Sequence, residues 1–246
     1  MQGYTRRQLK QDRFVETAEG AASWAAGHQR TLLVSIAVAA VVVLLAVGAY
    51  TWYNHQSEQA NIALGVAMRT FNMPLRPAGA PVPAGSEAES SFATIKDRAH
   101  AAQKQFSDVA DRYSMTAPGR IARYMEGVAA MQAGDNATAE KQLKSAADSS
   151  DKDVAALAKM ALANFYRASN RQADAIRLYK ELIDRPADTV SKADAQLALA
   201  DLYQSTDPKQ AASIYQQIQK DNPQSAAAQM AAARLSGKSQ GLNPSF

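Results

Sequence analysis

Residues 31–53 read TLLVSIAVAAVVVLLAVGAYTWY and contain no charged side chain. At a helical rise of about 1.5 Å per residue, a stretch of this length spans roughly 30 Å or slightly more, the thickness of the hydrocarbon core of a bilayer. Apolar residues surround it on every face, so it has no amphipathic stripe. The stretch predicts one transmembrane helix. It divides the chain into a cytoplasmic tail at 1–30, the span at 31–53, a polar domain at 54–236 and a disordered tail at 237–246.

The charges that flank the span predict its orientation. The preceding tail carries Arg6, Arg7, Lys10, Arg13 and Arg30, whereas the first residues after the span carry no Lys or Arg. Basic residues near a span favour the cytoplasmic side, so the large domain is expected on the opposite, periplasmic face. A cleaved signal peptide is the alternative, because residues 47–49 are small. The long tail and the long apolar stretch favour a retained anchor.

The composition argues against several classes of function. The chain has no Cys and only three His, which are far apart in sequence, so no metal site is expected. Phosphate-binding, dinucleotide-binding and nucleophile-elbow glycine motifs are absent, which predicts no cofactor and no enzyme. The net charge is only +4 and the basic residues are scattered, so no nucleic-acid partner is expected. Abundant Ala and sparse β-branched residues outside the span predict an all-α fold.

A proline-rich segment interrupts the helical pattern of the polar domain. Helical periodicity covers His55 to Phe71 and resumes from Phe92 to about Tyr113. Between them, the segment from Met73 to Ser91 contains four prolines and two glycines. Such a composition cannot hold a helix, and we expect a mobile loop, residues 73–91, that is not part of the fold.

The rest of the domain repeats with a period of 36 or 37 residues. Small residues recur at Ala102, Ala139, Ala175 and Ala211, and four residues after each stands Phe106, Leu143, Tyr179 or Tyr215. Upstream of the last three copies lie further small residues, Gly127, Ala163 and Ala200. Small residues let two helices approach closely, and large ones at helical spacing fill the seam. The pattern predicts a series of helical hairpins.

Turn residues lie between the two halves of each hairpin. Gly134 and Asn170 suit the left-handed conformation that ends a first helix. Asp135 and Asp207 can cap the second helix, and Pro208 fits its first turn. One hairpin cannot bury its own apolar face, but several stacked hairpins can, so the repeat predicts a solenoid.

This order of small, large and turn residues resembles the tetratricopeptide repeat from about Gln59 to Ser236. The resemblance implies a solenoid of about four hairpins, closed by a helix from Pro223 to about Leu235 with Gln229 and Arg234 facing outward. The chain departs from the family in its period, which exceeds the usual length of about 34 residues. It also departs in its first hairpin, which the proline-rich loop splits.

The whole layout resembles bacterial single-span proteins that carry a periplasmic tetratricopeptide domain. This group includes ancillary subunits of the Sec translocon that associate with a periplasmic chaperone. The resemblance implies a non-enzymatic scaffold in the inner membrane, with translocon subunits, a chaperone or secreted clients as partners. An organiser of the cell envelope that binds division or outer-membrane assembly factors is the alternative. The oligomeric state is left open.

Repeat solenoids bind along the concave face formed by the first helix of each hairpin. The residue after each small crossing residue and the residue three positions later should line that face. The residues four positions before Val128 and Asn164 should extend the row. These partner-binding candidates are Tyr124, Val128, Met131, Met160, Asn164, Arg167, Asp201 and Gln204. Such a mixed row suits an extended peptide or a partner's helix. Alternatively, the apolar members pack within the stack and the polar ones are ordinary surface.

Overall fold

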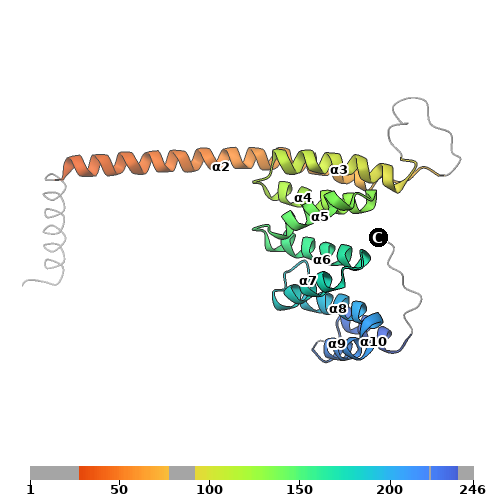
Figure 1. Cartoon of the computed structure of the whole chain (residues 1–246). Coiled ribbons are helices and arrows are strands. Elements are labelled where there is room, and N and C mark those ends of the chain that lie inside the picture. The colour runs from red at the N-terminus through yellow and green to blue at the C-terminus, as the bar shows by residue number, and fades with distance from the viewer. Residues whose placement is uncertain (1–27, 78–91, 222, 238–246) are drawn as a thin grey trace, which may run out of the picture. The chain divides into compact units, whose positions relative to one another are not determined.

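The computed structural model describes residues 28–77, 92–221 and 223–237, and its regular structure in these ranges is helical (Figure 1). Contacts divide the chain into two units, Met1–His55 and Gln56–Phe246. The predicted all-α class is confirmed. The helices are α2 Gln29–Phe71, α3 Ile95–Arg112, α4 Ala117–Ala133, α5 Asn136–Ala147, α6 Lys152–Ala168, α7 Gln172–Asp184, α8 Lys192–Thr206, α9 Pro208–Asp221 and α10 Ala226–Leu235.

Helix α2 continues without a break past the end of the predicted span. The sequence indicated a span to Tyr53 and a further helix from His55, whereas the structure has one helix to Phe71. Residues 54–58 contain neither Pro nor Gly, so nothing in the backbone chemistry stops the helix there. In the second unit, its buried Ala60 and Ala67 join a core cluster with Phe106.

The hairpins close where the sequence places small residues against large ones. A Cβ atom added at Gly127 would lie 2.7 Å from Cγ of Leu143, so only glycine permits this approach of α4 to α5. Ala175 is fully buried in α7, and the large residues Tyr179 and Tyr215 are almost or completely inaccessible. The predicted pairing of small and large residues is therefore confirmed in the core that runs from α4 to α10.

The turns within the hairpins also follow the sequence. Gly134 and Asn170 adopt the left-handed conformation, with φ of 79° and 59°. The carboxylate of Asp135 accepts a hydrogen bond from the Thr138 amide at 3.1 Å, and that of Asp207 accepts one from the Gln210 amide at 3.1 Å. These contacts satisfy amides that the first turn of a helix leaves unpaired.

The connection between α7 and α8, residues 185–191, is part of the packed structure. The Thr189 amide donates to Oδ1 of Asp153 at 3.1 Å, and the Thr189 hydroxyl donates to the Asp153 carbonyl oxygen at 3.0 Å. Val190 beside it is buried among Ala156, Leu182 and other residues of a small separate core. The connection is thereby attached to the start of α6, a feature that the sequence did not indicate.

Two pairs of helices that are not adjacent in sequence also contact each other. Helix α4 contacts α6, and α8 contacts α10, in addition to the contacts between helices adjacent in sequence. Within the part of the chain that the structure describes, no comparable contact joins α3 to α5, α5 to α7, or α6 to α8. We refer to the side formed by α4, α6 and α8 as the inner side of the stack, because the row of partner-binding candidates was predicted on these helices.

Two other expectations concern the margins of the domain. Most of the predicted loop lies at residues 78–91, outside the described residues, as do tails 1–27 and 238–246. The described loop ends are attached to the fold, because the Arg76 amide donates to the Phe92 carbonyl oxygen at 2.9 Å and Arg98 donates to the Met73 carbonyl oxygen at 2.8 Å. The prediction that Arg234 points outward is wrong, since its guanidinium forms an ion pair with Asp201 at 3.0 Å.

A polar cluster around Glu140 joins α5 to the following hairpin. Its carboxylate accepts hydrogen bonds from the Tyr166 hydroxyl at 3.1 Å and the Arg171 guanidinium at 2.9 Å, and Lys144 approaches to 2.7 Å. These cations, Lys144 first and then Arg171, lower the pKa of Glu140 to about 2. Arg171 also lies over the Tyr166 ring, 4.0 Å from its centroid.

Substituting Ala175 by Leu tests the crossing of α6 and α7. The added side chain must enter a fully buried site, so we expect the free energy of unfolding to fall by about 1–3 kcal/mol. Urea unfolding of the full chain in detergent, followed by circular dichroism, measures this loss. Ala173→Leu on the exposed face of the same helix is the control and should change stability little. An equal loss in both variants would refute the crossing geometry.

The Glu140 cluster predicts a pH-dependent part of the stability. The pKa of this carboxyl is lowered on folding to about 2, so its contribution is present above the ordinary carboxyl pKa and is lost as pH falls toward 2. We expect the stability difference between wild type and Glu140→Gln to shrink as pH drops from 5 to 2. Solvent reaches the cluster, so the effect should be modest. A difference that grows toward acid pH would contradict this assignment.

Candidate functional site

The predicted partner-binding residues lie along α4, α6 and α8. Arg167 and Gln204 are exposed, and the other six are half-buried. All eight belong to first helices, which form the inner side of the stack. The structure therefore brings them onto one series of helices. Several of them also make contacts within the fold. The row therefore contains apolar residues that pack against the core, polar residues that accept hydrogen bonds from tyrosines, and exposed polar residues.

The apolar members support the stack as well as contributing to its surface. Tyr124, Val128, Met131 and Met160 pack as partly buried residues against the central core. Burial raises the pKa of the Tyr124 hydroxyl. Part of each side chain remains accessible, so this packing leaves the row an apolar strip between α4 and α6.

Asn164 and Asp201 occupy equivalent positions in successive hairpins and make equivalent contacts. The Tyr179 hydroxyl donates to Oδ1 of Asn164 at 2.7 Å, and the Tyr215 hydroxyl donates to Oδ1 of Asp201. Arg234 from α10 completes the second contact. Burial raises the pKa of Tyr179 to about 12. The pKa of Tyr215 is also raised, first by burial and then by its hydrogen bond to the Asp201 carboxylate. Both acceptors therefore hold the two helices of a hairpin together.

The remaining polar members, Arg167 and Gln204, are exposed near the ends of α6 and α8. Each stands three residues after one of the two tyrosine acceptors, Asn164 and Asp201. Their side chains can be changed without removing the tyrosine hydrogen bonds described above. They are the members of the row best suited to a test of partner binding.

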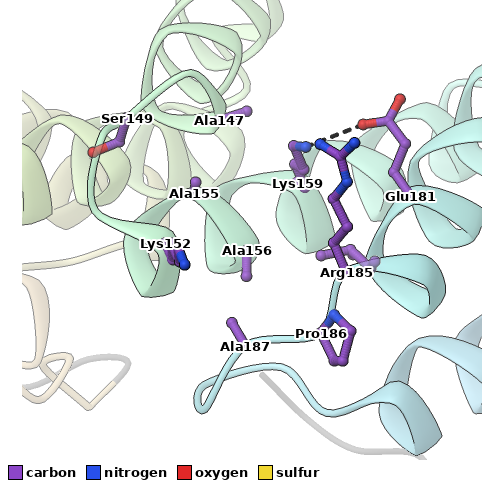
Figure 2. Close-up of a pocket in the computed structure, with 11 residues that line it drawn as sticks. Ala147, Ser149, Lys152, Ala155, Ala156, Lys159, Glu181, Arg185, Pro186 and Ala187 are labelled. Carbon is purple, nitrogen blue, oxygen red and sulfur yellow. Dashed lines mark hydrogen bonds and ion pairs between the residues drawn. The ribbon is translucent and has the colours of Figure 1, made fainter.

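A cavity of about 430 Å³ lies at another edge of the domain (Figure 2). It is formed by the end of α5, the start of α6, the end of α7 and the attached connection before α8. Its polar lining includes Lys152, Lys159, Glu181 and Arg185. Sequence reasoning did not find it, because these residues come from separate segments. The apolar Val190 within a polar connection is the one signal in the sequence from which packing there could have been predicted.

The ion pairs of this cavity determine its electrostatics. Lys159 lies 3.1 Å from Oε2 of Glu181, the contact drawn in Figure 2, and Arg177 lies 2.9 Å from the other oxygen. Burial pushes the pKa of Glu181 upward, but the two cations outweigh burial and lower it. Glu181 is therefore a paired anion, which is not an arrangement suited to acid–base chemistry. In the described residues, no three His, Asp or Glu side chains are grouped so as to hold a metal ion.

Comparison with known proteins identifies the repeat. Residues 30–185 match the family model of the tetratricopeptide repeat-like domain, which begins at the apolar stretch and extends through α7. No curated protein and no solved structure matches the chain significantly. Domains of this kind typically mediate interactions between proteins and are not catalytic. The match covers more than half of the sequence, and the chain therefore belongs to the tetratricopeptide repeat-like domain family.

Proposed function

We propose that this protein is a membrane-tethered scaffold that binds other proteins through its helical stack. The observation that carries the proposal is the character of α2. One window of this helix has a mean hydropathy of 2.9, and none of that window is buried. The same helix then enters the core of the hairpin domain at Ala60 and Ala67. A single element thus links an apolar segment to a repeat built for protein recognition.

The exposed surface of α2 supports membrane insertion. Large apolar side chains from Leu33 to Trp52 are mostly exposed, for example Leu44 at 70% and Leu45 at 68%. A continuous apolar surface of this size is unfavourable in water and favourable in hydrocarbon, where the helix also satisfies its own backbone hydrogen bonds. The family match begins at residue 30, so it includes this segment, which supports a retained anchor over a removed signal peptide.

The charge pattern supports an inner-membrane location with the N-terminus in the cytoplasm and the domain in the periplasm. The layout favours a role beside the Sec translocon, where the domain would hold translocon subunits, a periplasmic chaperone or secreted clients. Trp52 and Tyr53, at the far end of the apolar stretch, suit the membrane–water interface. Within this proposal, the inner row of α4, α6 and α8 is the surface that partners contact.

Thiol labelling tests the proposed topology. The chain has no Cys, so Gln8→Cys and Gln240→Cys each introduce one reactive group. In spheroplasts, we expect a membrane-impermeant reagent to label position 240 and not position 8, with both labelled after detergent is added. The reverse pattern would overturn the orientation. A mature N-terminus near Tyr50 would show that the apolar segment is a removed signal peptide.

The exposed part of the row can be tested without damaging the core. We expect the double variant Arg167→Ala and Gln204→Ala to recover at least about tenfold less partner from crosslinked membranes, since a few residues of an interface dominate its binding. Quantitative mass spectrometry of material co-purified with the full chain measures this. Translocon and chaperone subunits are the expected partners, and envelope-assembly factors would favour the alternative role.

The control for this experiment lies on the second helices. Lys180 and Gln216 are exposed on α7 and α9, so their replacement by Ala removes side chains of similar length. The control variant should keep its partners and its melting temperature. Loss of partners in the control, together with full retention in the row variant, would show that the inner row is not the recognition surface.

A further inference from the structure

A glutamate stands where the repeat elsewhere has leucine. The residue before each small crossing residue of a first helix is Leu162 in α6 and Leu199 in α8, and both are buried. In α4 the same position is Glu126, which is only 3% exposed. A buried carboxyl at a core position opposes the fold's own pattern and is costly unless it is paired. Its retention in this hairpin requires an explanation.

The partner position in the second helix changes together with it. Leu178 in α7 and Ile214 in α9 pack with the central core, whereas α5 has Gln142 at the corresponding position. The Gln142 side-chain amide donates to Oε1 of Glu126 at 3.0 Å. The carbonyl oxygen of Gln142 accepts from Arg123 at 3.2 Å. An apolar pair has thus been replaced by a connected polar pair in one hairpin.

This polar pair leaves one carboxylate oxygen without a hydrogen-bonding partner. Oε2 of Glu126 is buried and accepts no hydrogen bond of normal geometry. Burial is the main influence on this carboxyl and raises its pKa, while the nearby Ser107 hydroxyl, as a weak hydrogen-bond donor, the Arg123 charge and the Gln142 amide favour the charged form. A buried acceptor that lacks a donor costs about 1–3 kcal/mol, so the site gains from any donor that reaches it.

Glu126 lines a polar cavity of about 460 Å³ that opens between α3 and α5. Gln103 lines the same cavity, and its amide donates to Asp135 at 3.1 Å while its own carbonyl oxygen is buried and unpartnered. The lining has three carboxylates, Glu126, Asp108 and Asp135, against two lysines. The two residues that carry these buried acceptors therefore line one cavity, in which the carboxylates outnumber the lysines by one and His100 also takes part.

We propose that this cavity binds the guanidinium of an arginine from a partner polypeptide. Arginine carries several N–H donors in a planar fork and no acceptor, so one group can supply both unpartnered oxygens. Contact with a buried carboxylate makes the hydrogen bond charge-assisted and short. The inference rests on the proposed role in protein recognition, but it needs neither the membrane nor the inner row, since the cavity lies on the side of the second helices.

The side-chain amides of Gln103 and Gln142 can report occupancy directly. The full chain, labelled with ¹⁵N-glutamine and held in detergent micelles, is titrated with the capped tripeptide Gly-Arg-Gly while these amide signals are followed by NMR. We expect a saturable shift of both signals. The same peptide with norleucine in place of arginine, which lacks the donors, should bind at least about tenfold more weakly.

Two variants complete the test. Glu126→Leu combined with Gln142→Leu restores the apolar pair of the other hairpins, so it should melt no lower than wild type and should lose the arginine-dependent shift at Gln103. Glu126→Gln keeps the shape of the side chain and removes its charge, so it should weaken arginine binding at least about tenfold. It serves as the test if the leucine pair disturbs the fold. Lys152→Ala, at the cavity of Figure 2, is the control and should bind arginine normally.

Three outcomes would overturn the proposal. The first is an equal shift with the norleucine peptide, and the second is an unchanged shift in both Glu126 variants. The third is the absence of a saturable shift at peptide concentrations of about 20 mM, which would mean that only water binds the two acceptors. A failure to recover partners from membranes would refute the scaffold role but leave this titration unaffected. The two hypotheses therefore fail separately.

Discussion

The close approach of two helices at each hairpin crossing is the constraint on which the rest of the domain depends. At Gly127 the backbone of α4 lies so near Leu143 that a single added carbon would collide with it. At the equivalent crossings, the methyl groups of Ala175 and Ala211 are buried under the neighbouring helix. Since large residues one turn later fill the seam, each hairpin is a fixed unit, and the stacking of units positions the first helices along one side.

The sequence predicted much of this fold because the determinants are local and periodic. The left-handed turns at Gly134 and Asn170 and the cap at Asp135 follow from the chemistry of single residues. Features that depend on distant partners were not predictable in the same way. The attachment of Thr189 to Asp153 and the pairing of Arg234 with Asp201 join residues more than 30 positions apart, and neither has a pattern in the sequence.

The placement of the eight candidate residues on first helices was predictable, and the role of each residue was less so. Periodicity placed the eight residues on first helices, but it could not show that Asn164 and Asp201 accept hydrogen bonds from core tyrosines. The glutamate at position 126 was visible in the sequence as a break in the repeat. Its burial and its unpartnered oxygen became evident only in the structure. The polar departures from the repeat therefore mark both structural links and a candidate recognition site.

The central claim is that the stack presents a protein-binding surface beside a membrane. A photo-crosslinking amino acid at position 167, in the full chain within intact membranes, tests it most directly, because this exposed position lies at the end of α6 on the inner side. The account predicts discrete protein adducts in membranes. The same variant, purified in detergent away from other proteins, should give none. Crosslinks to lipid alone, or an adduct pattern identical to that from exposed Lys180 on α7, would contradict it.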